Sequence, residues 1–299
     1  MVLRLKLKRP MKTSTSILQS LKSSLLGLAL LGLVAASGSA QAAGPKAYQF
    51  VTSGANTSGS ITTLDNPALN GKPKLNLIVA HKYTVGYNNH ALGLRYNFST
   101  GKWQVQHEDG VAVPLGETIN VLNAPGAKRL GTSAFTTDDY ITYFPISKNK
   151  PNALLLATHV INPVQSFSGV KVADPFSTYF WNGQWSIYTD NFAAMKAAAF
   201  NIVDVTKLKA NGAPASFLFT TTPTNISADL ALIDNPLTNN KPNAVVFARH
   251  IWTSASPTYV NKEVGVYYNG SKWGIFMEDS SAMPEDAAFA VTVIPQATP

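Results

Sequence analysis

The chain has 299 residues and no cysteine, and only 13% of its residues are charged. An average soluble domain has about 25% charged residues, and coiled coils and charged disordered chains have more, so the composition excludes both classes. The formal net charge is +8, but most of the excess lies in residues 1–42, which contain no acidic residue. The rest of the chain is close to neutral, so its charge gives no reason to expect nucleic-acid binding.

Residues 1–42 have the pattern of a secretory signal peptide. A basic start precedes an apolar run over residues 25–36, and Ala40-Gln41-Ala42 is an A-x-A cleavage motif. Met11 is an alternative start, because Met11-Lys12 already supplies a basic beginning. The apolar run is shorter than the roughly 20 residues that span a bilayer, so we expect no transmembrane segment. An exported chain without cysteine is typical of a bacterial periplasm or the cell exterior.

The remainder of the chain contains three copies of one sequence unit. In each copy a Lys-Pro step precedes an apolar run that ends at a histidine, and a tryptophan follows after a turn. Proline and histidine are eight residues apart in every copy, and each tryptophan lies ten residues before a Val or Met. These spacings predict tandem repeats over residues 44–123, 130–206 and 215–294. The repeated positions are Pro73, Pro151 and Pro242, then His81, His159 and His250, and then Trp103, Trp185 and Trp273.

Apolar runs and turn dipeptides indicate that the repeats are all-β. Residues 75–80, 154–158 and 245–248 are short apolar runs just after a proline, which is typical of buried strands. Asn182-Gly183 and Asn269-Gly270 favour positive φ and precede a tryptophan strand, so they predict hairpins. We expect four to five short antiparallel strands per repeat. The repeats form either three β-sandwich-like modules or one pseudo-threefold β domain.

The third copy carries several motifs together. They are Asn235-Pro236-Leu237, Asn240-Lys241-Pro242-Asn243-Ala244, Gly265-Val266-Tyr267-Tyr268, Lys272-Trp273-Gly274-Ile275-Phe276 and Met283-Pro284. This set resembles a repeat of secreted bacterial proteins that is classed as a domain of unknown function. The resemblance covers nearly the whole chain after the leader and is weakest in the first copy, where Gln104-Val105-Gln106-His107 replaces apolar residues. It implies an exported β-rich module and carries over no catalytic residue.

Two sets of repeated side chains are candidates for metal ligands. The histidines, one per repeat, could hold Zn²⁺ if the repeats converge on an axis. They are His81, His159 and His250. Asp109, Asp190 and Asp279 follow the tryptophan strands and could supply oxygen ligands to Ca²⁺. The simpler roles are a bond from each histidine to a backbone carbonyl and turn capping by each aspartate, so we expect no cofactor, with Zn²⁺ or Ca²⁺ as exceptions.

Aromatic side chains are the candidates for ligand binding. The repeated tryptophans lie opposite other aromatic residues across each hairpin, and we interpret them as core residues. Tyr83, Tyr87 and Trp252 lie in the loops after the histidine strands, where binding residues tend to occur, and Trp181 lies at a hairpin end. Their flat faces could stack on the C–H-rich faces of sugar rings.

The sequence contains no G-x-S-x-G elbow, no H-E-x-x-H motif and no P-loop, and the lack of cysteine excludes a thiol nucleophile. Repetition favours binding, because one active site does not need three similar copies. We therefore predict an exported non-enzymatic protein that binds a glycan or another cell-surface component. One alternative is a passive component of the envelope or extracellular matrix. Another is a hydrolase of an exported polymer, which requires two close carboxylates or a Ser–His pair.

Overall fold

A computed structural model describes residues 44–131, 137–138, 141–163 and 169–299 of the chain. The predicted signal peptide, residues 1–42, lies outside the described residues. Within the described ranges the regular secondary structure consists of strands, so the predicted all-β fold class is confirmed. Over those same ranges, no helix has the length and apolar character needed to cross a membrane.

In the described part of the chain each repeat forms seven strands, more than the four to five that the sequence predicts. The first repeat has β1 (Lys46–Val51), β2 (Thr57–Ser58), β3 (Ile61–Leu64), β4 (Leu77–Lys82), β5 (Leu92–Asn97), β6 (Lys102–His107) and β7 (Thr118–Asn123). The second has β8 (Lys128–Gly131), β9 (Thr137–Asp138), β10 (Ile141–Phe144), β11 (Leu155–Val160), β12 (Phe176–Trp181), β13 (Gln184–Thr189) and β14 (Ala199–Asp204). A small hairpin of β15 (Lys209–Ala210) and β16 (Ala213–Pro214) follows. The third has β17 (Ser216–Thr220), β18 (Ile226–Ser227), β19 (Leu230–Leu232), β20 (Val245–Trp252), β21 (Val264–Tyr268), β22 (Trp273–Met277) and β23 (Ala288–Ile294).

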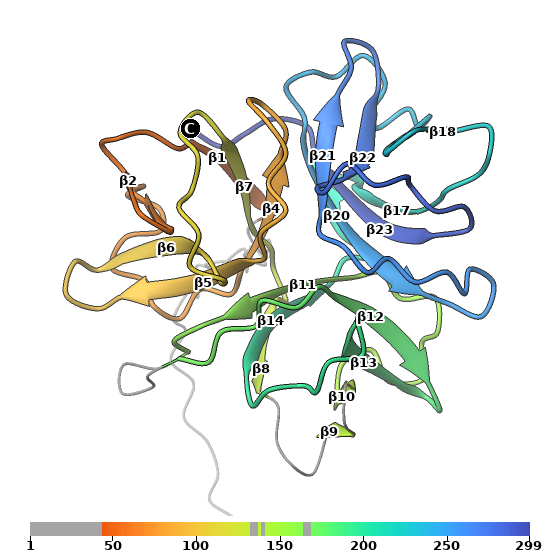
Figure 1. Ribbon diagram of the computed structural model, residues 1–299, viewed down its shortest axis with the longest axis horizontal. Helices are drawn as coiled ribbons and strands as arrows, with labels where there is room; N and C mark the ends of the chain where they lie inside the picture. The colour runs from red at the N-terminus through yellow and green to blue at the C-terminus, as the bar shows by residue number, and fades with distance from the viewer. Residues whose placement is uncertain (1–43, 132–136, 139–140, 164–168) are drawn as a thin grey trace, which may run out of the picture. The chain divides into compact units, whose positions relative to one another are not determined.

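Every large sheet is built from strands of two repeats (Figure 1). The first, seventh and fourth strands of one repeat join the fifth, sixth, third and second strands of the repeat before it. The first repeat takes the third as its predecessor, so the pairing closes into a cycle. The strand orders are β1-β7-β4-β21-β22-β19-β18, β2-β3-β6-β5-β11-β14-β8 and β17-β23-β20-β12-β13-β10-β9. The repeats therefore do not form separate sheets.

Two repeats meet at one parallel strand pair in each large sheet. These pairs are β4 with β21, β11 with β5, and β20 with β12. Within each repeat the paired strands are antiparallel, as the sequence predicts. The sequence predicts only antiparallel strands, because hairpin turns carry information about strands that are close in sequence. The parallel junctions join strands from different repeats, and no turn specifies them.

The repeated tryptophans lie in the core, as predicted. Each indole is at most 1% exposed. Each indole N–H donates a hydrogen bond to the carbonyl of the lysine that precedes the repeated proline. The donors and acceptors are Trp103 and Lys72 at 3.0 Å, Trp185 and Lys150 at 2.9 Å, and Trp273 and Lys241 at 2.8 Å. The spacing found in the sequence therefore reflects one contact, made three times, that buries the ring without leaving its N–H unpaired.

Candidate functional sites at the repeat boundaries

The repeated histidines form a buried pair with a carboxylate at each boundary between repeats. Each histidine lies near the end of its strand, and its acid comes from the preceding repeat in the cycle. The six side chains are at most 4% exposed. The pairs are His81 with Glu278, His159 with Glu108 at 2.7 Å, and His250 with Asp190 at 3.5 Å. Each pair therefore joins two repeats, and the three pairs close the same cycle as the sheets.

These pairs correct the alignment of the acidic positions. Glu108, Asp190 and Glu278 each lie five residues after the repeated tryptophan. Asp190 is therefore equivalent to the two glutamates. The calcium hypothesis had assumed that Asp190 is equivalent to Asp109 and Asp279. The second repeat has an asparagine where the other two have those aspartates. A calcium site in each repeat would require an aspartate at this position in all three repeats, and the second repeat does not have one.

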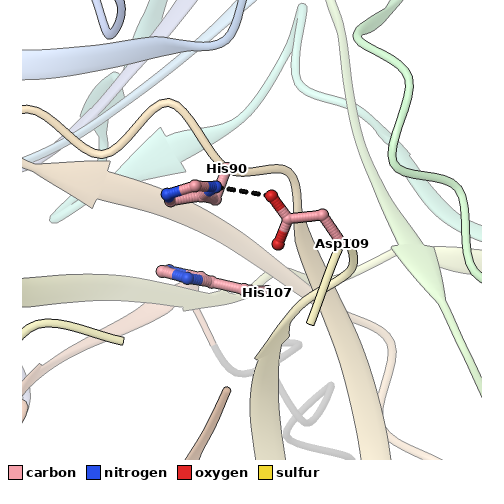
Figure 2. Close-up of side chains that lie close together, drawn as sticks. All are labelled: His90, His107 and Asp109. Atoms are coloured by element: carbon pink, nitrogen blue, oxygen red, sulfur yellow. Dashed lines mark hydrogen bonds and ion pairs between the residues drawn. The ribbon is translucent and has the colours of Figure 1, made fainter. Parts of the chain in front are cut away.

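The three histidines have different partners, and within the described ranges their ligand atoms are not grouped around one point. Nε2 of His250 lies 3.0 Å from the Thr258 carbonyl, the kind of bond that the simpler prediction expected of all three rings. Among the residues that the structure describes, one other group of side chains has ligand atoms close enough together for a metal ion. It consists of His90, His107 and Asp109 (Figure 2).

The length of each acid matches the size of the residue that faces it. Where the acid is glutamate, the facing residue is glycine, and a Cβ there would overlap the carboxylate. Where the acid is aspartate, the facing residue is serine, whose Oγ donates a hydrogen bond to Oδ2 at 2.6 Å. The facing pairs are Gly93 and Glu108, Ser177 and Asp190, and Gly265 and Glu278. The serine hydroxyl therefore fills the space that the shorter acid leaves.

The second oxygen of each glutamate holds the loop that follows the histidine strand. Oε2 of Glu278 accepts a hydrogen bond from the backbone N–H of Asn88 at 2.7 Å, and Oε2 of Glu108 accepts one from Val172 at 2.5 Å. Asn88 and Val172 are equivalent, since each lies four residues before the fifth strand of its repeat. The carboxylate thus fixes both the histidine and the loop next to it, and Tyr87 precedes Asn88 in that loop.

Within the described part of the chain, His81 has a second acidic neighbour that the other two histidines lack. Its Nε2 lies 3.2 Å from Oε2 of Glu117, the residue immediately before β7. Burial by itself would lower the pKa of His81, but the bonds to Glu117 and Glu278 outweigh burial and raise that pKa to about 9. The imidazolium is therefore the form present at neutral pH, and it compensates two buried carboxylates.

The unfolding free energy is expected to fall by about 2 kcal/mol between pH 7 and pH 9 because of His81. A folded pKa of about 9, against 6.5 in the unfolded chain, adds stability that is fully present below pH 6.5. This stability is lost as the pH rises through 9. Urea unfolding at both pH values measures the loss, and His81→Gln should flatten the curve in this window. Equal stability of the wild-type protein at the two pH values would contradict the prediction.

A second buried ionisable group lies where the three repeats meet. Burial raises the pKa of Glu263 to about 7, the charge of Arg249 opposes the rise, and nearby acids add to it. Those acids are Asp190, Glu278 and Glu108. A carboxyl that titrates near neutrality is a candidate for acid–base catalysis. However, the cavity that Glu263 borders has a volume of about 30 Å³, whereas ligand pockets measure about 300–1,000 Å³. It has no room for a polymer substrate.

Arg249 is held in place by the second repeat. Its guanidinium donates hydrogen bonds to the carbonyls of Phe176 at 3.1 Å and Ala157 at 3.0 Å. It also lies 4.4 Å from the centre of the Phe176 ring. Neither Arg249 nor Glu263 is predicted from the sequence, because each occurs in one repeat and in no motif.

Four aromatic side chains gather on the outside of the boundary between the first and third repeats. We call this group aromatic cluster A, and it consists of Tyr83, Tyr87, Tyr267 and Phe276. Their rings make edge-on contacts with centroids 5.4–5.8 Å apart. The hydroxyl of Tyr87 donates a hydrogen bond to Asp229 at 2.8 Å. Together they line a depression of about 230 Å³.

The boundary between the second and third repeats carries an equivalent group. We call it aromatic cluster B, and it consists of Trp252, Tyr259, Tyr179 and Tyr188. Each member occupies the same repeat position as the corresponding member of cluster A. Centroids are 5.0 Å apart for Tyr179 and Trp252, 5.9 Å for Tyr188 and Tyr259, and 6.1 Å for Trp252 and Tyr259. The cluster lines a smaller depression of about 80 Å³.

The boundary between the first and second repeats has no aromatic residue at these four positions, all of which the structure describes. They are occupied by Ile161, Lys171, Arg95 and Gln106. Arg95 donates a hydrogen bond to Gln106 at 3.3 Å, between β5 and β6 of the first repeat. The parallel pair of β5 and β11 nevertheless forms here as it does at the other two boundaries. Aromatic side chains are therefore not required to close the cycle.

The model of the family described as "Domain of unknown function (DUF7452)" matches the chain three times, over residues 39–123, 93–204 and 197–293. The chain belongs to the DUF7452 family. Its second match begins inside β5 and ends at β14, so it includes most of β5, the strand of the first repeat that pairs with the second. No curated protein and no solved structure matched the chain.

The structure places the predicted ligand-binding residues in the two clusters of this DUF7452 chain. Tyr83 and Tyr87 belong to cluster A and Trp252 to cluster B, while Trp181 stacks on Tyr179 at the edge of cluster B at 6.3 Å. The predicted ligand-binding residues did not include the strand members of the clusters, such as Tyr267 and Phe276. Alternation along the strands could have found them, because Tyr267 alternates with the buried Val266 on β21 and Phe276 faces away from Trp273 on β22.

Proposed function

We propose that the protein is exported and binds a glycan through aromatic clusters A and B, without catalysing a reaction. One observation carries the proposal: the third boundary closes without any of the four aromatic residues that the other two boundaries share. Closing the cycle of repeats therefore does not explain why the other two boundaries leave aromatic side chains exposed to water. Tyr87 is 48% exposed, Tyr259 45% and Trp181 60%. Such surface is typical of a binding site.

The chemistry of the clusters suits sugar rings. A pyranose presents C–H groups on a face and hydroxyl groups at its edge, so it binds where an aromatic face has polar groups beside it. In cluster A these polar groups are the Tyr87 hydroxyl and the Asp229 carboxylate, which already bond each other at 2.8 Å. Both depressions are smaller than pockets for drug-sized ligands. Each depression suits one sugar ring or the end of a glycan. Two such sites on one protein molecule could bind the same polymer at two places.

Export supports a glycan as the ligand class. The leader pattern of residues 1–42 predicts a location in the periplasm or outside the cell, where polysaccharides and envelope glycans are the abundant polymers. A cell-surface component is therefore the partner that we propose, and the near-neutral remainder of the chain does not favour nucleic acid.

Loss of one exposed tyrosine from each cluster is expected to weaken glycan binding about tenfold per site, the equivalent of 1.4 kcal/mol. The protein without leader or tag is screened on a glycan array and against envelope polysaccharides, and the best ligand is titrated by calorimetry. Tyr87→Ala tests cluster A and Tyr259→Ala tests cluster B. On a polymer that engages both sites, the double variant should lose more than either alone.

The repeat supplies matched controls. Lys171 occupies the position of Tyr87 and Tyr259 at the third boundary, so Lys171→Ala should leave binding unchanged. Tyr87→Phe keeps the ring but removes the hydroxyl that bonds Asp229, so it should lose less affinity than Tyr87→Ala. Absence of binding to every sugar and envelope fraction would refute the proposal, as would binding that neither tyrosine variant affects. In that case sedimentation of the free protein would test the structural role, which requires self-association.

A further inference from the structure

Each repeat contains a polar pair at the same place beside the boundary. The pair joins the residue two places before the fifth strand to the residue after the repeated acid. The pairs are His90 and Asp109 at 2.5 Å, Asp174 and Asn191 at 2.8 Å, and Lys262 and Asp279 at 2.7 Å. A polar contact at this place is thus a common feature of the three repeats, although the pair of residue types that makes it differs in each repeat.

The first repeat differs from the others in the residue beneath the pair. His107 takes the place of Thr189 and Met277. Its ring is fully buried and stacks on His90 with centroids 4.8 Å apart and planes 30° apart (Figure 2). A threonine or a methionine fills this position in the sibling repeats, so the fold does not demand an imidazole here.

The hydrogen bonds of His107 leave one of its nitrogens unpaired. Nδ1 lies 3.1 Å from the Val111 carbonyl, so it carries the proton and donates it. The hydroxyl of Thr189 makes the equivalent bond in the second repeat, to the Ala193 carbonyl at 2.5 Å. Nε2 of His107 is then a lone-pair nitrogen, and it is buried without a hydrogen-bond partner among the residues that the structure describes. A buried nitrogen of this kind is costly unless something binds it.

We propose that His90, His107 and Asp109 form a binding site for a divalent transition metal ion, with Zn²⁺ as the first choice. One ligand atom from each side chain lies within 4.8 Å of the other two. Two imidazoles and a carboxylate form a known type of zinc site, which leaves a fourth position for water or a ligand. The bond from Nδ1 of His107 to a backbone carbonyl is the contact that typically orients a metal-binding histidine.

Binding requires a small movement of His90. The ligand atoms of a tetrahedral site with bonds of about 2.0–2.2 Å are closer together than 4.8 Å, and stacked rings do not point their lone pairs at one centre. His107 is fixed by burial, but the side chains of His90 and Asp109 are 29% and 34% exposed. His90 lies in the loop before β5, so its ring can turn out of the stack and toward the ion.

The sibling repeats provide the variants that test the site. His107→Met and His90→Lys introduce the residues of the third repeat, and the new lysine can still pair with Asp109. Each is expected to weaken Zn²⁺ binding by at least about 100-fold, because a ligand is lost and not merely its support. Lys262→Ala breaks the equivalent pair in the third repeat and should leave Zn²⁺ affinity unchanged.

The experiment titrates the untagged protein with ZnCl₂ by calorimetry and with CoCl₂ by visible absorption. One equivalent of Zn²⁺ and the ligand-field bands of a tetrahedral Co²⁺ site are expected for the wild-type protein and for Lys262→Ala. Absence of saturable binding at one equivalent would overturn the proposal, and so would equal affinity in His90→Lys. If His107→Met does not fold, His90→Lys still decides, because its position is partly exposed and its partner is kept.

Discussion

Glu278→Ala is expected to lower the free energy of unfolding by about 3–5 kcal/mol, the cost of removing one partner of a buried ion pair. The side chain is 1% exposed and faces His81, whose imidazolium would remain buried with Glu117 alone. The backbone N–H of Asn88 would also lose its acceptor. Urea unfolding at pH 7, compared with the wild-type protein, measures the difference.

A nearby surface acid separates this effect from a general loss of charge. Glu285 lies in the same repeat and is exposed, so Glu285→Ala should change the unfolding free energy by less than about 0.5 kcal/mol. Because Asn88 follows Tyr87, the Glu278 variant should also loosen the loop of cluster A. Amide exchange of that loop should rise in Glu278→Ala and not in Glu285→Ala. Equal stability of the two variants would show that the His81 pair does not stabilise the fold.

The features that sequence predicted best are those that lie within one repeat. The Lys-Pro step, the tryptophan and the hairpin turns are local, and the structure joins them by one hydrogen bond and one turn per copy. At Asn182-Gly183 both residues have positive φ, 47° and 78°, as a two-residue hairpin turn requires. Three copies also supplied their own comparison, because a spacing that recurs in each must reflect a structural contact.

The features that sequence did not predict lie between repeats. The histidine of one repeat meets the acid of another, as His159 meets Glu108, and nothing in the spacing within a repeat reports on that contact. Alignment on aspartate type, rather than on distance from the tryptophan, placed Asp190 one position out of register. The substitution of glutamate by aspartate concealed the equivalence, and the compensating serine at Ser177 becomes meaningful only when the two side chains are seen in contact.

This compensation leads to the second large expected effect. Gly93→Ser alone is expected to cost about 3 kcal/mol, because its Cβ would overlap the carboxylate that holds His159. The backbone at Gly93 is not in the left-handed region, so the cost arises from this contact and not from φ. Glu108→Asp alone leaves a gap beside the buried histidine and should cost about 1–3 kcal/mol.

The double variant Gly93→Ser/Glu108→Asp should recover most of this loss, because it recreates the Ser177–Asp190 pair of the second repeat. A double-mutant cycle by urea unfolding should give a favourable interaction energy of about 2 kcal/mol or more. The reverse exchange, Ser177→Gly with Asp190→Glu, should behave in the same way at the next boundary. If the free-energy changes of the two single variants simply add in both cycles, the serine does not compensate for the shorter acid. The boundaries then do not share one packing arrangement. If the interaction energy is large in both, one geometry supports either pair, and the repeats differ in side-chain length while keeping the same buried volume.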